Sequence, residues 1–252
     1  MILEASSNVT ATNIIICVLF MLLSYIIGSI PFGLILGKLI CHKDIREYGS
    51  KNIGTTNAIR VLGKKVGFTV FFFDVLKGAF VIIILMILNA CNVYSSPIEY
   101  LWYGAAAIVG HSFSIFLKFK GGKAVATSLG VVLILSPLSA ISCLIVFAIF
   151  LFATGYVSLG STFAALTVVT VGWLLHFFGL DATNPLEYMI GKTSLGICIL
   201  FSLAATLIWL KHIKNYKRLL NGTENSFKKK KKDENNSDNK ENVNTEVEKK
   251  AS

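Results

Sequence analysis

Charged side chains are gathered into short segments of this chain, and the stretches between those segments are long and uncharged. Of the 252 residues, 54% are hydrophobic and 15% are charged, whereas soluble domains carry about 25% charged residues. A helix of about 20 apolar residues spans the hydrocarbon core of a bilayer. The sequence therefore predicts an all-α, polytopic integral membrane protein. The long uncharged stretches are residues 5–37, 78–98, 100–117, 124–180 and 193–210.

The number of crossings and their direction follow from the charges between the stretches. Cytoplasmic loops of membrane proteins carry an excess of Lys and Arg, and residues 38–65 contain seven of them. The stretch 124–180 begins after a turn with three lysines and ends before a loop with two acids. It must therefore cross an odd number of times, and its length fits three crossings. We expect about seven transmembrane helices, with the N-terminus outside and the C-terminus in the cytoplasm.

The approximate bounds of these helices follow from the same stretches. Ser136–Pro137 and residues 155–160 supply the breaks inside the longest stretch. Its first part, residues 124–135, is expected to be a half-helix that begins inside the protein. The other expected helices cover residues 14–40, 67–91, 100–117 and 192–210.

The chain divides into residues 1–221, a transmembrane domain, and residues 222–252, a Lys-rich tail that is expected to be disordered. Lysines 228–232 of the tail either rest on anionic lipid or remain solvated. The first stretch has no basic segment before it, so we interpret it as a retained helix and not as a signal peptide. The five cysteines contain no CxxC pair, which predicts neither a disulfide nor a metal site.

One polar turn between two of the stretches has the composition of a phosphate site. Gly121 and Gly122 precede the expected helix start, where backbone amides and the helix dipole favour an anion. Lys123 adds a mobile positive charge. The same three residues are also typical of an ordinary basic loop. The interpretation therefore depends on which other polar groups meet this turn.

Other unusual polar groups fall at the same, cytoplasmic ends of the expected helices. Asp74 and Lys77 lie on one helix face and either bind a ligand or neutralise each other. His111 lies inside the membrane edge and is either a packing residue or a proton acceptor. His212 and Asn215 share a face at the end of the last helix. Glycines and hydroxyls are added by GSKNIGTTNAIRVLG at residues 49–63 and GYVSLGS at residues 155–161.

A different pattern lies on the opposite side. His176 and Asp181 have the H-x4-D spacing of the base in acyl-CoA-dependent acyltransferases. The expected topology places them outside, away from every basic loop, and the spacing arises easily by chance. We expect these two residues to have no role in the reaction.

Taken in order, the polar segments resemble the acyl-phosphate-dependent glycerol-3-phosphate acyltransferases of bacterial membranes. The similarity extends to about Glu224. It departs from the family pattern at Lys51 (commonly Gly), Ser114 (commonly Pro) and Gly155 (often Arg). The departure at Gly155 removes a positive charge and leaves open whether another base replaces it. The matching segments are GSIPFG (28–33), GSKNIGTTNAIRVLG (49–63), DVLKG (74–78), GHSFSIFLKFKGGKAVAT (110–127), YVSLGS (156–161) and HIKNYKRLLNGTE (212–224).

The resemblance implies a compact seven-helix protein of the cell membrane that transfers an acyl chain from acyl phosphate to glycerol 3-phosphate at its cytoplasmic side. The product is lysophosphatidate, and the reaction is the first membrane step of phospholipid biosynthesis. Because the donor is an activated mixed anhydride, the glycerol hydroxyl attacks it directly and no acyl-enzyme is needed. Because both substrates carry phosphate, the site needs convergent cations and amides.

The resemblance also implies roles for individual residues. Lys123, Arg60 and the amides of Gly121 and Gly122 would bind phosphate, and either His111 or the substrate's own phosphate would accept the proton. The expected catalytic residues are His111, Lys123 and Asn215. The expected substrate-binding residues, of which the first four either orient glycerol 3-phosphate or order their loop, are Ser50, Asn52, Thr55, Asn57, Arg60, Lys77, Gly121, Gly122, Ser158 and His212.

The expected partners are acyl phosphate, glycerol 3-phosphate and membrane lipid, and the enzyme that supplies acyl phosphate is a further candidate. No cofactor and no nucleic acid partner are expected. The alternative is a membrane transporter of a small phosphorylated or inorganic anion. A transporter would also need polar groups on the outer side, where this chain has few. A third reading is a non-catalytic assembly partner of lipid enzymes.

Overall fold

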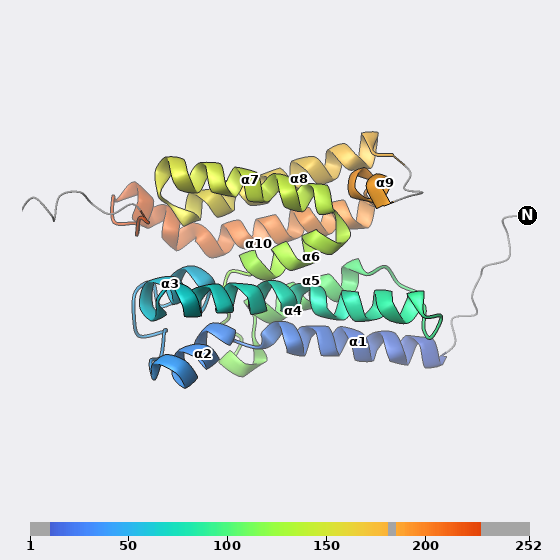
Figure 1. The fold of residues 1–252 in the computed structure, drawn as a ribbon, viewed down its shortest axis with the longest axis horizontal. Helices are drawn as coiled ribbons and strands as arrows, with labels where there is room; N and C mark the ends of the chain where they lie inside the picture. Colours follow the sequence, from blue (N-terminus) through green and yellow to red (C-terminus); the bar gives the residue numbers. More distant parts are fainter. Residues whose placement is uncertain (1–10, 181–184, 228–252) are drawn as a thin grey trace, which may run out of the picture.

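Helices account for the regular secondary structure of residues 11–180 and 185–227, which are the residues that the computed structural model describes (Figure 1). This confirms the all-α prediction. An isolated bridge joins Leu180 and Gly191. The helices are α1 (Ala11–Ser29), α2 (Phe32–Cys41), α3 (Thr55–Leu62), α4 (Lys64–Ala90), α5 (Leu101–Ser112), the short 3-10 helix η1 (Ile115–Leu117), α6 (Val125–Leu135), α7 (Pro137–Thr154), α8 (Val157–Phe178), α9 (Pro185–Ile190) and α10 (Leu195–Leu220).

Five of these helices are long and apolar enough to cross a membrane, namely α1, α4, α7, α8 and α10. Helices α5 and α6 have 12 and 11 residues, fewer than the about 20 residues of a full span. The position and length of α6 agree with the half-helix expected at residues 124–135. Seven crossings and the orientation of the two termini stay predictions, and the expected disordered tail lies almost wholly outside the described residues.

The helix expected over residues 14–40 is divided into α1 and α2, and the break between them lies at Ile30 and Pro31. Proline has no N–H group and its ring clashes with the preceding turn, so a helix does not continue through it unchanged. The Ile30 carbonyl at the break accepts a hydrogen bond of 2.8 Å from Lys77 Nζ. Lys77 therefore stabilises the broken helix from the neighbouring α4.

Two further differences lie at the polar end of the chain's helices. Helix α10 continues to Leu220 and does not end near residue 210. Lys217 and Arg218 occupy its last turn, where positive charge interacts favourably with the helix dipole. Residues 55–62 form α3, although the sequence predicts no helix there.

Helix α6 lies between two groups of helices. It contacts α4 and α5 on one side and α7 on the other, with α1, α4 and α5 forming one group and α7, α8 and α10 the other (Figure 1). A Cβ atom at Gly78 of α4 would collide with the Thr127 carbonyl oxygen, and one at Gly130 of α6 with the Val75 carbonyl oxygen. The two glycines therefore let α4 and α6 pack backbone against backbone.

One end of the molecule collects the segments that carry polar residues. This is the left end in Figure 1, where α3 and the start of α4 lie near the α7–α8 turn and the last turns of α10. The start of α6 is held near this end by its contact with α4. Segments from five parts of the sequence therefore meet at this end of the molecule.

Candidate active site

A polar pocket lies at this end of the helices. Its walls come from the loop before α3, from α3 and α4, from the end of α5, the start of α6, the α7–α8 turn, and the last turns of α10 with the segment after it. Most of the expected site residues take part in these walls. They are Ser50, Asn52, Thr55, Arg60, His111, Lys123, Ser158, His212 and Asn215.

Lys123 is held by a chain of hydrogen bonds. Its Nζ donates to Asn215 Oδ1 at 2.6 Å, and Asn215 Nδ2 donates to Glu224 Oε1 at 2.7 Å. Arg218 Nε donates to the other oxygen of Glu224 at 2.8 Å. An ammonium group has three N–H donors, so Lys123 keeps further donors for a ligand while Asn215 fixes its direction.

The cations of the pocket exceed the acids that offset them. Burial lowers the pKa of Lys123 to about 8, an effect that Glu224 opposes and Arg218 strengthens. Burial also lowers the pKa of Arg60. Burial by itself would raise the pKa of Glu224, but hydrogen bonds from Asn215 and Arg218 outweigh it and the pKa is lowered. Glu224 therefore stays ionised and pairs with Arg218, while Lys123 and Arg60 have no acid of their own among the described residues.

Asn57 orders the loop that carries the hydroxyl and amide residues. The Ser50 amide donates to Asn57 Oδ1 at 2.9 Å, and Asn57 Nδ2 lies 3.0, 3.2 and 2.9 Å from the carbonyl oxygens of Ile45, Tyr48 and Asn52. The side chain is only 1% exposed and does not reach the pocket wall. Of the two roles predicted for it, the structure supports the ordering of the loop.

Thr55 is placed differently from Asn57. It lines the pocket, and its Oγ1 is buried without a hydrogen-bond partner among the residues that the structure describes. A buried hydroxyl that lacks a partner is costly, so a polar ligand in the pocket would satisfy it. The Thr55 hydroxyl is therefore available to a ligand in the pocket.

Lys77 is used inside the protein and does not line the pocket. Its Nζ lies 2.7 Å from Asp74 Oδ1 in addition to its contact with Ile30, and it is 3% exposed. Asp74 reaches the pocket wall, and its Oδ1 lies 3.8 Å from His111 Nδ1. Of the two predicted roles, the structure therefore favours an ion pair in which Asp74 and Lys77 neutralise each other. The carboxylate of Asp74, and not Lys77, lies at the pocket wall.

The glycines of the GGK turn allow close packing against His111, and their backbone amides contribute less to the pocket than the sequence predicts. The Gly122 N–H donates to the His111 carbonyl oxygen at 3.0 Å, so it is not free to bind phosphate as predicted. A Cβ atom at Gly121 would collide with that same carbonyl, and one at Gly122 with His111 Nε2. The start of α6 remains directed at the pocket, since Ala124, Val125 and Ala126 all line it and a helix N-terminus favours an anion.

His212 presents one ring nitrogen to the pocket. Its Nδ1 lies 2.8 Å from the Ile208 carbonyl oxygen, an acceptor, so Nδ1 carries the proton. In the neutral ring Nε2 is then an acceptor. His212 can therefore accept a hydrogen bond from a ligand hydroxyl.

Sequence reasoning missed three charged residues of the wall as site residues, Asp74, Arg218 and Glu224. Asp74 had a signal, because an ionisable residue inside an apolar helix is a candidate functional residue. Glu224 ends the last segment that resembles the family, but its place in the wall depends on a turn at Asn221 and Gly222 after α10. The Phe227 N–H donates to the Gly155 carbonyl at 2.8 Å and holds this returning segment against the α7–α8 turn.

Gly155, where the family often has Arg, ends α7 with a φ of 78°, a left-handed conformation that glycine adopts without strain. The residue therefore has a backbone role in this chain. Arg218 and Arg60 lie in the pocket, but no observation assigns either of them as a replacement for the missing charge.

The H-x4-D pattern lies away from the pocket. His176 lies in the last turn of α8, whereas Ser158 lies in its first turn. The Nδ1 atom of His176 lies 2.8 Å from the Thr193 carbonyl oxygen. Asp181 lies outside the described residues. In the described ranges no group of three or more His, Cys, Asp or Glu side chains is arranged to hold a metal ion.

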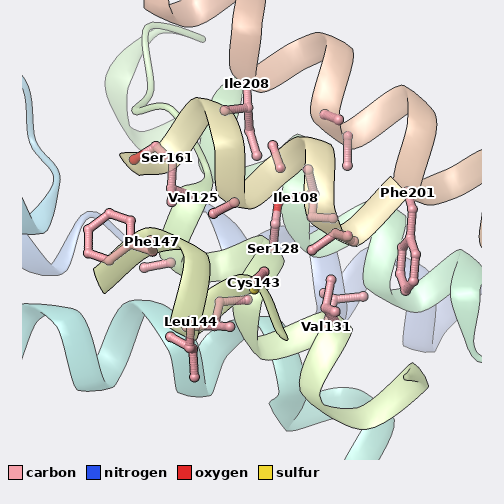
Figure 2. A pocket seen from close by; sticks show the side chains of 18 of the residues that line it. Ile108, Val125, Ser128, Val131, Cys143, Leu144, Phe147, Ser161, Phe201 and Ile208 are labelled. Atoms are coloured by element: carbon pink, nitrogen blue, oxygen red, sulfur yellow. The ribbon is translucent and has the colours of Figure 1, made fainter. Parts of the chain in front are cut away.

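An apolar pocket adjoins the polar one (Figure 2). It is formed mainly by α6, α7, α8 and α10 and extends along the helices towards the middle of the protein. The two pockets share five wall residues, so the apolar pocket lies directly beside the polar one. The shared residues are Phe71, Val125, Ala126, Phe147 and Ser161.

Comparison with known proteins gives consistent similarities. The family model described as glycerol-3-phosphate acyltransferase matches residues 18–222. A glycerol-3-phosphate acyltransferase of Desulfotalea psychrophila is 45% identical over 215 residues, covering 84% of this chain and 98% of the relative. Glycerol-3-phosphate acyltransferase 2 of Bacillus anthracis is 43% identical over 210 residues, covering 83% and 98%.

A solved structure is similar in fold as well. It is the crystal structure of PlsY (YgiH), an integral membrane glycerol 3-phosphate acyltransferase, in its glycerol 3-phosphate form. It superposes with a TM-score of 0.69 at 32% identity and covers 84% of this chain and 95% of that one. The lysophosphatidic acid form of the same protein superposes with a TM-score of 0.65.

Proposed function

This chain belongs to the glycerol-3-phosphate acyltransferase family, and from that premise we propose that it uses acyl phosphate as donor and reacts it in the polar pocket, on the cytoplasmic side of the membrane. The protein is a multi-pass membrane enzyme that acylates glycerol 3-phosphate in phospholipid biosynthesis. The observation that carries the proposal is the pair of cations, Lys123 and Arg60, beside an apolar pocket that shares five wall residues with theirs.

Phosphate binding in this proposal depends on Lys123, Arg60 and the start of α6. Two phosphorylated substrates bring roughly four negative charges, which only convergent cations and amides can hold. The loop ordered by Asn57 adds Ser50, Asn52 and the unpartnered Thr55 hydroxyl. These neutral groups orient the glycerol 3-phosphate without changing the charge of the pocket.

The reaction itself needs no enzyme nucleophile. The glycerol hydroxyl oxygen attacks the acyl carbonyl carbon of the mixed anhydride, a new ester bond forms, and the bond from that carbon to the phosphate oxygen breaks to release inorganic phosphate. Holding the two reactants in contact supplies much of the rate, and Lys123 with the α6 amides stabilises the negative charge that develops on the carbonyl oxygen.

The proton of the attacking hydroxyl goes either to His111 or to a substrate phosphate. His111 lines the pocket, and its Nδ1 lies 3.8 Å from Asp74 Oδ1. His212 Nε2 accepts a hydrogen bond from the hydroxyl and orients it. Asn215 positions Lys123 through its side-chain oxygen.

The acyl tail of the donor occupies the apolar pocket. Its carbonyl carbon then lies at the shared wall, within reach of both the phosphate groups and the hydroxyl. The exposed face of Leu144, at one side of the apolar pocket (Figure 2), gives the tail a path from the lipid of the bilayer.

The test is a donor competition with the purified full chain. Acyl phosphate, acyl-CoA and acyl carrier protein thioester are each supplied with glycerol 3-phosphate, and lysophosphatidate and phosphate are measured together. We expect acyl phosphate alone to support turnover, with one phosphate released per lysophosphatidate and no acylated protein in the mass spectrum of a quenched reaction. Turnover with a thioester donor, or an acyl adduct that forms and decays at the turnover rate, would contradict the proposal.

A further inference from the structure

The apolar pocket has a definite length. On α10 its wall runs from Ile208, one turn from His212, to Phe201 and Leu200, and on α8 it runs from Ser161 to Val168. Each run covers two helical turns, which is about 10 Å at the helical rise of 1.5 Å per residue. The pocket is therefore a slot that begins at the polar pocket and extends part of the way across the bilayer.

Small side chains create the space in the middle of this slot. Ala164 and Ala165 of α8 face Ala204 and Ala205 of α10 around it, and all four alanines are buried. Larger residues at these positions would fill the slot, because protein interiors leave little unused volume. The slot therefore exists because of residue size at these few positions.

Phe201 closes the far end of the slot. The side chain is 2% exposed and packs against Val132 and Ala140. Its ring is pressed against α8, where a Cβ atom at Gly172 would lie 2.9 Å from Phe201 Cδ2. Figure 2 shows Phe201 at the opposite end of the pocket from Phe147, which belongs to the wall shared with the polar pocket.

The slot begins beside the polar pocket, and this position indicates what occupies it. A molecule whose charged end is held by Lys123 and whose other end is apolar fits the combined space, and the acyl chain of the donor has this form. A chain that stays inside the slot gains binding free energy with each buried methylene. A chain that reaches Phe201 must bend or leave past Leu144, which is 41% exposed.

We propose that Phe201 and Ala204 set the acyl-chain preference of the enzyme, with Phe201 as the closed end of the slot and Ala204 as the small residue that keeps the slot open one turn before it. This rests on the proposed function, since it assigns the apolar pocket to the transferred chain. Both residues act through contact with the chain and not through the reacting atoms.

The test uses a series of donors with each variant of the full chain. Octanoyl, lauroyl, palmitoyl and stearoyl phosphate are compared by kcat/KM at saturating glycerol 3-phosphate. Ala204→Phe blocks the slot and is expected to lower the palmitoyl-to-octanoyl ratio at least about tenfold, the scale on which apolar pockets discriminate. Phe201→Ala lengthens the slot and is expected to move the optimum to a longer donor.

Leu203→Phe is the matched control for Ala204→Phe. It adds an aromatic ring at the next position of α10, but Leu203 is 64% exposed on the lipid-facing side and does not line the slot. Its donor ratio is expected to stay at the wild-type value. Octanoyl transfer by each variant reports that the protein is folded and that the polar pocket works.

The outcomes separate this inference from the proposed function. Donor ratios unchanged in both Ala204→Phe and Phe201→Ala, with octanoyl transfer intact, would overturn the chain-length proposal and leave the donor assignment standing. If Ala204→Phe loses octanoyl transfer as well, the donor series with Phe201→Ala becomes the deciding test. A donor-length optimum that stays at the wild-type value in Phe201→Ala would then overturn the proposal. A wild-type enzyme that accepts only thioesters would instead overturn the donor, and the same variants would then be scored with the thioester series.

Discussion

Lys123 is the residue on which the proposed phosphate site depends most. Its side chain is held by Asn215 and has no acid of its own among the described residues. We expect Lys123→Ala to lower kcat/KM for glycerol 3-phosphate at least about a hundredfold, the scale of losing one transition-state contact. Initial rates of the purified variants measure this. Lys120→Ala, which removes an exposed lysine of the same turn, is the control, and near-normal rates with Lys123→Ala would exclude Lys123 from the site.

The pH dependence of binding follows from the same side chain. The pKa of Lys123 is about 8, so the ammonium form predominates below that pH and is lost as the pH rises through it. Because kcat/KM reports the free enzyme, we expect it to fall as the pH rises through about 8. Arginine remains charged at these pH values, so Lys123→Arg should move the fall to higher pH. A fall that stays in place in Lys123→Arg would assign it to another group.

Residues could be predicted from the sequence where their chemistry is unusual for their position. Lys123, His212 and Asn215 are polar at the end of apolar stretches, and all three line the pocket. Lys77 is equally unusual, but the sequence could not indicate that the Ile30 carbonyl lies within its reach. Glu224 could not be predicted because its approach depends on a turn and a long-range backbone contact.

At the scale of single elements, the loop before α3 depends on Asn57. Asn57→Ala leaves the Ser50 amide and the carbonyl of Ile45 without this partner, and an unsatisfied buried group costs about 1–3 kcal/mol. We expect the free energy of unfolding to fall by about this amount and the KM for glycerol 3-phosphate to rise. Thermal melting and initial rates measure the two effects.

Asn89→Ala is the matched control for that change, because Asn89 is exposed on α4 and lies at the end away from the pocket. The control should keep both the stability and the KM of the wild type. An Asn57→Ala variant as stable as the control would show that the loop does not need this side chain.

Elements could be predicted where one local feature decides them. The uncharged stretch between the GGK turn and Pro137 gave the bounds of α6 closely. The sequence could not decide between a kink and a break at Pro31, because a proline can either kink a helix or end it. In the structure, Lys77 Nζ donates to the Ile30 carbonyl oxygen at the break. Helix α3 was missed because it is short, begins with Thr and Asn residues of low helix propensity and lies between two glycines; its packing on α4 could not be read from the sequence.

At the scale of the whole molecule, the orientation in the membrane can be tested with a native cysteine. Cys91 is exposed at the end of α4 away from the polar pocket, while Cys17, Cys143 and Cys198 are buried. If the pocket faces the cytoplasm, a membrane-impermeant maleimide should label Cys91 in intact cells. Mass spectrometry of the purified protein measures the label, and Cys91→Ser is the control. Labelling of Cys91 only after lysis would reverse the proposed orientation.

The same end-to-end polarity predicts that the H-x4-D pattern is not part of the reaction. His176 packs edge-on against Trp173 and Phe177, near the end of α8 opposite Ser158. We expect His176→Ala and Asp181→Ala to keep turnover close to the wild-type rate in the donor assay. Loss of turnover in both variants, with melting temperatures unchanged, would contradict the assignment of the site to the polar pocket.

At the scale of the whole molecule, the meeting of the polar helix ends could be predicted from the sequence. The arrangement of the apolar interior could not. Charge segregation indicates which helix ends meet, because charged groups avoid the hydrocarbon. That the slot lies between α8 and α10 could not be foreseen, because alanines that line a space and alanines that pack closely are identical in a sequence. Only the placement of Phe201 and its neighbours in space distinguishes the two cases.

The wall that the two pockets share has a consequence for inhibition. Because Phe71, Val125, Ala126, Phe147 and Ser161 border both spaces, the two substrates occupy adjoining parts of one site. A bisubstrate mimic, in which a non-transferable alkyl ether joins the tail to glycerol phosphate, would fill both spaces at once. Such a compound would exclude donor and acceptor together, so it would inhibit competitively against each of them, and raising the concentration of either one would relieve the inhibition.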